Sequence, residues 1–399
     1  MSSASSSLSL PSSLDFPSSL SFPPSFLWGT ATAAHQIEGG NDRNDFWAAE
    51  LRPGTPFAEP SGAACDSFNR YPEDIEIVRS LGLQAYRFSL EWSRIETEPG
   101  EFSQAAISHY RSMVEQCHAS GIEPVVTLHH FTNPLWFSRL GGWTNPQAPE
   151  HFERFCSAVL PILSDVRLIC TINEPTVLSE AAHLLTDPPG QAHNPLIKQY
   201  LLEAHKRAVE LLHAEGGHEV GITLALPAWV VLPGGEEAAR AKQRVDEDFF
   251  FEQLRGDDFV GVQTYTTLVA GPEGIIEPDD SERQTLMGWR FTPEALGETV
   301  RRTAQATGCP IYVTENGIAT NDDAERIEYV TRALESVSSA IADGVDVRGY
   351  FYWSLLDNFE WLRGYEPTFG IVGVDRATFT RTTKPSATWL GELSQRMRA

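Results

Sequence analysis

The chain of 399 residues contains no uninterrupted apolar stretch of about eighteen residues, so we expect no membrane-spanning helix. It is also poor in positive charge, because 30 lysines and arginines stand against 54 aspartates and glutamates, giving a formal net charge of −24. A surface of this sign repels nucleic acid and anionic lipid, whereas a neutral ligand such as a sugar tolerates it. We therefore expect neither a nucleic acid nor a membrane partner.

Cysteine and cofactor-binding motifs are scarce as well. The five cysteines are odd in number, widely spaced and without a CxxC pair, so we expect no disulfide framework and a cytoplasmic location. No dinucleotide fingerprint, P-loop or GxSxG elbow occurs, so no cofactor is expected. His129 and His130 are adjacent, but neighbours at a strand end point to opposite sides and no further ligand cluster has suitable spacing. We therefore expect no metal ion.

The N-terminal segment differs in composition from the rest of the chain. Its first 21 residues contain eleven serines and two prolines, without a basic region or a continuous apolar run. This composition is not that of a secretion signal and is typical of a disordered tail. We predict a disordered tail over residues 1–24 and one domain over residues 25–399.

Beyond this tail, short apolar runs alternate with amphipathic helical patterns, which indicates parallel βαβ units. Strands are expected at 26–33, 85–90, 123–128, 167–172, 220–225, 259–265, 311–314 and 347–353. Helices are expected at 71–81, 105–120, 149–163, 197–214, 236–254, 293–306, 324–342 and 385–398. Eight strands, each followed by a helix, predict an α/β fold of the (β/α)8 TIM barrel type.

A glutamate follows two of the predicted strands within two residues. Glu174 follows the run 167–172, and Glu315 follows the run 311–314. Because active sites of such barrels lie at the C-terminal strand ends, both carboxylates are expected at one pocket. Cleavage of a glycosidic bond needs such a pair, one acting as an acid and the other as a nucleophile or base. The alternative is two unrelated exposed glutamates.

Other polar and aromatic residues also follow the predicted strands. They are Gln36, Glu38, Arg87, His130, Asn173, Tyr265, Trp353, Glu360 and Trp361. Hydroxyl-rich ligands need such donors and acceptors together with a flat aromatic face. Arg87 could hold one glutamate in its charged form, although a purely structural salt bridge is an alternative reading. For Tyr350 and Tyr352 we expect a place in the core.

Several motifs together resemble glycoside hydrolase family 1, the β-glucosidase family. They are FLWGTATAAHQIEG at 26–39, YRFSLEWSRI at 86–95, TINEP at 171–175, TENG at 314–317 and WSLLDNFEW at 353–361. The similarity runs from about residue 26 to about residue 389. It implies a barrel enzyme that uses no cofactor and releases a nonreducing terminal sugar from a small-molecule β-glycoside with retention of configuration.

The resemblance also implies a role for each matching residue. Glu174 matches the acid/base and Glu315 the nucleophile of the family, while Asn173 matches the residue that binds the sugar 2-hydroxyl. Tyr265 and Arg87 match the partners that orient the nucleophile, and Asn316 is a further supporting residue. The binders of the nonreducing sugar correspond to Gln36, His130, Glu360 and Trp361, and its aromatic platform to Trp353.

The sequence departs from the family pattern in three places. Gln263-Thr264-Tyr265 stands where Asn-Tyr-Tyr is common, and His130-Phe131-Thr132 stands where His-Trp-Asp is common. The region between residues 175 and 264 is shortened, chiefly after Phe251. These regions shape the pocket wall and the leaving-group side, so they bear on substrate preference.

The most favoured reading is a β-glucosidase acting on an unphosphorylated sugar, because a carboxylate at Glu360 would repel a 6-phosphate. Specificity for a β-galactoside or β-fucoside is an alternative, and so is a transglycosidase that uses the same site with an acceptor in place of water. A noncatalytic sugar-binding barrel and a metal-dependent barrel enzyme of another class remain as further alternatives. The oligomeric state is left open.

Overall fold

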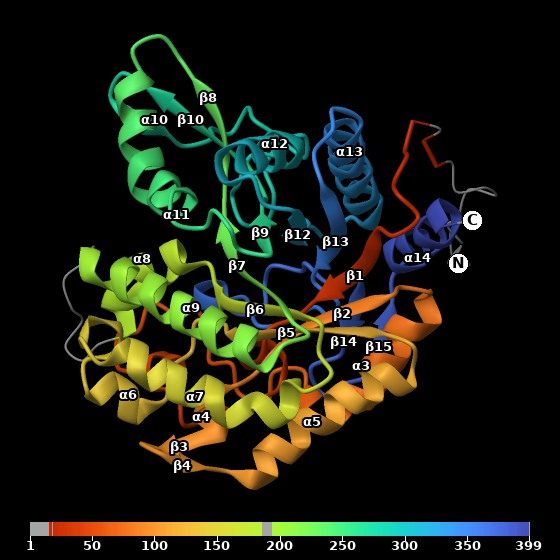
Figure 1. Ribbon diagram of the computed structural model, residues 1–399. Helices are drawn as coiled ribbons and strands as arrows, with labels where there is room; N and C mark the ends of the chain where they lie inside the picture. The colour runs from red at the N-terminus through yellow and green to blue at the C-terminus, as the bar shows by residue number, and fades with distance from the viewer. Residues whose placement is uncertain (1–15, 18, 186–193, 399) are drawn as a thin grey trace, which may run out of the picture.

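The computed structural model describes residues 16–17, 19–185 and 194–398, and eight parallel strands in it close into a barrel (Figure 1). Around the barrel each strand pairs with its two neighbours, and β13 pairs with β1 to close the ring. In ring order the strands are β1 (Leu27–Ala31), β2 (Ala85–Ser89), β5 (Glu123–His129), β6 (Leu168–Asn173), β7 (Glu219–Ala225), β9 (Phe259–Gln263), β12 (Ile311–Asn316) and β13 (Val347–Trp353). The predicted (β/α)8 barrel is confirmed, and every predicted strand is found within two residues of its expected ends.

Long helices surround the barrel. They are α3 (Ser67–Leu81), α5 (Gln104–Ala119), α7 (Ala148–Leu163), α9 (Pro195–Glu215), α10 (Glu236–Gln243), α12 (Ala295–Thr307), α13 (Asp323–Ala342) and α14 (Pro385–Arg398). The helix expected over 236–254 is found over 236–251. Its middle, Arg244–Asp248, is π-helical and separates α10 from the short α11 (Phe249–Phe251), which the sequence prediction did not anticipate.

Smaller elements lie in the connections. The short helices are α1 (Ala34–Ile37), α2 (Asp45–Glu50), α4 (Trp92–Ile95), α6 (Leu135–Arg139) and α8 (Pro175–Leu185). The short strands are β3 (Glu96–Glu98), β4 (Glu101–Phe102), β8 (Ala228–Val231), β10 (Thr267–Gly271), β11 (Gly274–Ile276), β14 (Val372–Val374) and β15 (Arg381–Thr383). Among them, β8 follows β7 and β10 follows β9, and with β11 they form a small sheet that lies beside α10 away from the barrel (Figure 1).

The alternation of side chains along a strand places polar groups at one end of the barrel interior. Ala85 and Val125 belong to the inner apolar cluster, and Arg87 and Thr127 follow two residues later on the same faces. Because side chains repeat every second residue, the sequence of each strand changes from apolar filling to polar groups as it reaches its C-terminal end. The outward residues, such as Tyr350 and Tyr352, pack in the larger cluster toward the helices, as expected.

The expectation of a disordered tail as far as residue 24 is wrong for its last residues. Leu20 and Phe22 are buried, and the Phe22 ring lies 4.7 Å from Phe26 and 4.9 Å from Trp28. The Ser21 amide also donates to Ser338 Oγ on α13 at 3.0 Å. Two apolar side chains spaced two residues apart thus add to the core, whereas residues 1–15 and 18 lie outside the described chain.

Two further findings concern the cysteines and the helices. All five cysteines are buried free thiols, in agreement with the absence of a disulfide framework in the sequence prediction. Within the described ranges, no helix combines the length and the apolar character that crossing a membrane requires.

The substitution Phe22→Ala is expected to lower the free energy of unfolding by about 3 kcal/mol, because it removes a buried aromatic ring from between two others. Urea unfolding followed by tryptophan fluorescence would measure the change. The control Leu51→Ala removes a side chain that is 60 % exposed and should change stability by no more than about 0.5 kcal/mol. Equal stability of Phe22→Ala and the parent chain would show that this segment does not contribute to the core.

Candidate active site

Both glutamates lie where the pairing register between neighbouring barrel strands is irregular. On β6 the register against β7 shifts between Cys170 and Asn173, just before Glu174, and on β12 the register against β9 shifts between Val313 and Glu315. Such irregularities redirect side chains and are frequent next to active sites. Glu174 also has a φ of 44°, which is unusual for a residue other than glycine. Its amide donates to the Thr223 carbonyl at 2.9 Å, so this backbone is fixed to β7.

Each oxygen of the Glu315 carboxylate has its own donor. Arg87 Nη1 lies 2.6 Å from Oε1, and the Tyr265 hydroxyl donates to Oε2 at 2.7 Å. Arg87 is fully buried, and its Nε donates to Thr127 Oγ1 at 3.0 Å. The carboxylate is therefore held in one orientation by a charge-assisted bond on one side and a hydroxyl on the other.

Asn173 is oriented by three donors that converge on its amide oxygen. Oδ1 accepts from Arg87 Nη2 at 2.6 Å, from Thr223 Oγ1 at 2.9 Å and from Gln263 Nε2 at 2.9 Å. In this orientation Nδ2 lies 3.3 Å from His130 Nε2. The guanidinium of Arg87 thus contacts both Asn173 on β6 and Glu315 on β12.

The environments of the two carboxyl groups differ. Burial raises the pKa of Glu174 well above its usual value, and the charge of Glu315 raises it further, against the opposing effect of Arg87. Burial also raises the pKa of Glu315, but there Arg87 and the Tyr265 hydrogen bond act in the opposite direction. No described side chain donates a hydrogen bond to the Glu174 carboxyl, so its environment favours the neutral form more than that of Glu315 does.

Most of the residues predicted for the pocket line one cavity of about 590 Å³, a volume typical of small-molecule sites. They are His130, Glu174, Tyr265, Glu315, Trp353, Glu360 and Trp361. Three other predicted residues lie behind the cavity wall and contact its residues or backbone: Arg87 and Asn173 as described above, and Asn316, which donates to the Thr264 carbonyl at 2.7 Å.

Several rings and polar side chains at the cavity wall contact one another. His130 is nearly parallel to Trp353 and Trp361, with centroids 5.9 Å and 6.2 Å away. Gln36 Nε2 donates to the Phe359 carbonyl at 2.8 Å and to Glu360 Oε2 at 3.3 Å. Burial, with a contribution from Glu315, raises the pKa of Glu360 to about 8.

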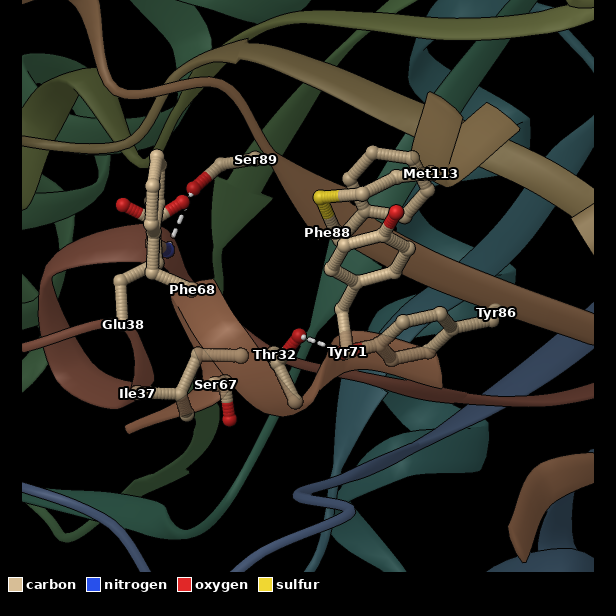
Figure 2. Close-up of a pocket in the computed structure, with 11 residues that line it drawn as sticks. Thr32, Ile37, Glu38, Ser67, Phe68, Tyr71, Tyr86, Phe88, Ser89 and Met113 are labelled. Carbon is tan, nitrogen blue, oxygen red and sulfur yellow. Dashed lines mark hydrogen bonds between the residues drawn. The ribbon is translucent and has the colours of Figure 1, made fainter. Parts of the chain in front are cut away.

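Glu38 does not reach the cavity, although the strand-end pattern grouped it with the pocket residues. It lies at a separate internal pocket of about 10 Å³, next to Phe68 and Ser89 (Figure 2). Its carboxylate accepts from Tyr110 and is paired with Arg94 at 2.9 Å. That pocket has room for only about one water molecule, and both Glu38 oxygens already have partners, so Glu38 has a structural position.

The sequence patterns also missed part of the cavity wall. It includes Trp229, Leu268, Met287 and Trp289, which come from the small sheet and from the loop between β11 and α12. No motif or strand-end position marks them. Thr127 and Thr223, which form hydrogen bonds with Arg87 and Asn173, could have been found from the sequence. The alternation of side chains along β5 and β7 places both of them inside the barrel.

Comparison with known proteins agrees with this geometry. The model of the family described as glycosyl hydrolase family 1 matches residues 18–258 and 263–398. The chain belongs to glycosyl hydrolase family 1. It is 31% identical to beta-glucosidase A of Thermotoga maritima, over 91% of this chain and 95% of that protein. It is also 31% identical to a bifunctional beta-D-glucosidase/beta-D-fucosidase of Bifidobacterium breve, over 91% of this chain and 96% of that protein.

A solved structure of a beta-glycosidase also resembles this chain closely. The crystal structure of a beta-glycosidase superposes with a TM-score of 0.90 at 43% identity, and the match covers 95% of this chain and 98% of that one. The resemblance that the sequence motifs indicated is therefore confirmed.

The substitution Tyr265→Phe is expected to raise the pKa of Glu315, because the hydrogen bond that it removes favours the ionised carboxylate. Titration of the side-chain carboxyl by carbon-13 NMR of glutamate-labelled protein would measure the shift. The control Tyr312→Phe removes a hydroxyl from β12, the strand that carries Glu315. Tyr312 precedes Glu315 by three residues, and its substitution should leave the pKa of Glu315 unchanged. A pKa of Glu315 that stays constant in Tyr265→Phe would contradict this assignment.

Proposed function

We propose that this protein is a retaining β-glucosidase that releases unphosphorylated glucose from the nonreducing end of a β-glycoside. The observation that carries the proposal is the unequal environment of the two glutamates in one cavity. Glu315 is held by Arg87 and Tyr265, while the Glu174 carboxyl has no such partner and a strongly raised pKa. A carboxylate nucleophile and a protonated acid are the two states that the first step of retention requires.

In the first step, a Glu315 oxygen attacks the anomeric carbon and the glycosidic bond breaks. Its electron pair passes to the leaving oxygen, which takes the proton of Glu174, and a glycosyl ester on Glu315 remains. In the second step, Glu174 takes a proton from water, the water oxygen bonds to the anomeric carbon, and the ester bond to Glu315 breaks. The two carboxyl groups account for every proton and electron pair, so the proposal needs no metal ion or cofactor.

The remaining residues bind the sugar in this proposal. The three donors to Asn173 Oδ1 fix the amide so that Nδ2 lies near His130, and in this proposal Nδ2 binds the 2-hydroxyl. Gln36, His130, Glu360 and Trp361 bind the other hydroxyls, and Trp353 supplies the flat face beneath the ring. Glu360 offers a carboxyl where a phosphosugar would need a cation, which supports an unphosphorylated substrate.

A β-fucosidase activity is the second candidate. The relative from Bifidobacterium breve with both activities in its name favours it. Transglycosylation by the same covalent intermediate differs only in the acceptor, so product analysis with added alcohol distinguishes it from hydrolysis. We also propose a cytoplasmic location, which the five free thiols support.

A panel of nitrophenyl β-glycosides tests the sugar preference, and a 2-deoxy-2-fluoro-β-glucoside with a dinitrophenolate leaving group tests the mechanism. The fluorosugar should add to the chain once, and peptide mass spectrometry should find it on Glu315. Inactivity toward the whole panel, or labelling at another residue, would contradict the proposal.

The substitutions Glu315→Ala and Glu174→Ala are expected to differ in their dependence on the leaving group. Without Glu315 no ester forms, so activity should fall by at least about 10⁴-fold on every glycoside. Without Glu174, turnover of an alkyl glucoside should fall by about 10²–10⁴-fold, whereas glycosylation by dinitrophenyl glucoside should change little because that leaving group needs no proton. Equal losses of the glycosylation rate on both substrates for Glu174→Ala would exclude its role as the acid.

The substitution Gln263→Met is expected to lower kcat/KM for nitrophenyl β-glucoside by about tenfold, since Asn173 loses one of its three donors. Stability should be nearly unchanged, because the buried Gln263 Oε1, which has no partner among the described residues, is removed as well. The matched substrate is nitrophenyl 2-deoxy-β-glucoside, which lacks the hydroxyl assigned to Asn173 and should be hydrolysed equally by both proteins. A similar loss on both substrates would contradict this positioning role.

A further inference from the structure

His35 is a buried residue that the proposed mechanism does not use and that is not among the residues lining the cavity. It precedes Gln36 on α1, and its side chain is as fully buried as that of Glu50, the last residue of α2. Its Nε2 lies 2.7 Å from Glu50 Oε1, and its Nδ1 lies 2.9 Å from Asn44 Nδ2. Because hydrogen bonds to an imidazole lie close to the plane of the ring, these two contacts together fix that plane.

The partners of His35 determine which ring nitrogen carries the hydrogen. Asn44 caps α2, and its Oδ1 accepts from the Trp47 amide at 2.8 Å, so its Nδ2 is left to donate to His35 Nδ1. His35 Nε2 then carries the hydrogen and donates it to Glu50. The other Glu50 oxygen accepts from the amide and the hydroxyl of Ser61, at 2.8 Å and 2.7 Å. The imidazole is therefore held in one tautomer and one orientation.

The indole of Trp361 lies parallel to this imidazole. The two ring planes differ by 12° and the centroids are 5.8 Å apart, which is an offset parallel arrangement. Trp361 also has a φ of 45°, and such a backbone conformation persists only where the surrounding structure holds it. Since Trp361 lines the cavity, the position of its indole there depends on the groups that pack against it.

Three further rings in the described ranges pack against Trp361, and none of them is fixed as His35 is. Phe46 and Phe131 lie 4.9 Å and 5.1 Å from the indole and carry no polar atom that could orient their rings. His130 lies 6.2 Å away, and its Nδ1 has no partner in the part of the chain that the structure describes. Of these four rings, His35 is the one with a hydrogen bond at each of two ring atoms.

We propose that His35 is a positioning residue, which through its two hydrogen bonds holds the Trp361 indole at the angle that the nonreducing sugar requires. The inference rests on the proposed function, in which Trp361 binds a sugar hydroxyl. A displacement of about 1 Å far from the reacting atoms can cost an enzyme about 10²-fold in rate. Loss of the hydrogen bond from Asn44 or to Glu50 should thus weaken catalysis, although neither residue lines the cavity.

A buried histidine with two partners can also have a purely structural role. In that case its replacement would lower activity by the same factor whichever residue stands at position 361. A positioning role predicts a different result, because two residues that act on one another give effects that do not add. A double-mutant cycle therefore distinguishes the two roles.

The first test is a double-mutant cycle between His35→Phe and Trp361→Phe. His35→Phe keeps a flat ring but removes both hydrogen bonds, so kcat/KM for nitrophenyl β-glucoside should fall by about tenfold or more. In the Trp361→Phe background the same substitution should cost less than about threefold. Equal losses in the two backgrounds would overturn the proposal.

Asn44→Ser is a milder variant, and it replaces His35→Phe in the cycle if that protein fails to fold. Serine caps a helix about as well as asparagine, so α2 should keep its N-terminus while His35 Nδ1 loses its donor. The loss of kcat/KM should again depend on the residue at position 361. The matched control is Asn194→Ser, the same exchange at the N-cap of α9, where Asn194 Oδ1 accepts from the Leu196 amide at 3.0 Å. This control should leave kcat/KM unchanged.

The second test observes the indole directly and needs no turnover. In protein labelled with 5-fluorotryptophan, the fluorine-19 resonance that disappears in Trp361→Phe belongs to Trp361. In Asn44→Ser this resonance should shift or broaden, because the imidazole beside the indole is no longer fixed. In Asn194→Ser it should stay where it is in the parent chain. An unchanged Trp361 resonance in folded Asn44→Ser would overturn the proposal.

Failure of this inference and failure of the proposed function give different results. Hydrolysis of nitrophenyl β-glucoside by the parent chain, with additive effects in the cycle, contradicts the inference alone. Absence of turnover on every glycoside, together with an unlabelled Glu315 after treatment with the fluorosugar, contradicts the proposed function itself. The fluorine resonance would then still measure whether His35 holds Trp361 in place.

Discussion

The buried guanidinium of Arg87 is the interaction on which the geometry of the cavity depends. It lies inside the barrel without solvent exposure, and its donors reach β5, β6 and β12. An isolated buried charge is strongly unfavourable, so Arg87 requires the Glu315 carboxylate as its partner. The same group orients Asn173, and thus one cation links the proposed nucleophile to the amide that we propose binds the sugar. The ion pair between Arg87 and Glu315 therefore stabilises the barrel interior and also orients Glu315.

The difference between the two glutamates follows from this cation. Glu315 has Arg87 and Tyr265 to offset its burial, whereas Glu174 is placed after an irregular strand end with a left-handed backbone and without a donor. Phe131 and Trp361, which also line the cavity, share the positive φ, at 72° and 45°. Unfavourable backbone conformations at three positions around one cavity agree with the common finding that strain gathers at functional sites.

The barrel and the inner site could be predicted from the sequence because both follow the two-residue period of the strands. Once strands are assigned, Arg87, Asn173 and Glu315 must reach the same end of the barrel. The rest of the cavity wall could not be predicted, because Met287 and Trp289 lie in a long connection without periodicity. The π-helical segment between α10 and α11 escaped prediction for a related reason, since such a segment leaves the sequence pattern helical. The packing of Leu20 and Phe22 was not predicted, because the serine-rich composition around them is typical of a disordered segment.

The small sheet of β8, β10 and β11 has a consequence for how this enzyme can diversify. In our proposal the sugar site contains Arg87, Asn173 and Glu315, whose contacts also connect strands of the barrel, so these residues cannot change independently. The part of the cavity wall that contains Trp229 and Leu268 is instead carried by an appendage attached to the ends of β7 and β9. New preferences could thus arise in descendants of this gene, or in the laboratory, by exchanging that appendage while the reacting carboxyls stay where they are.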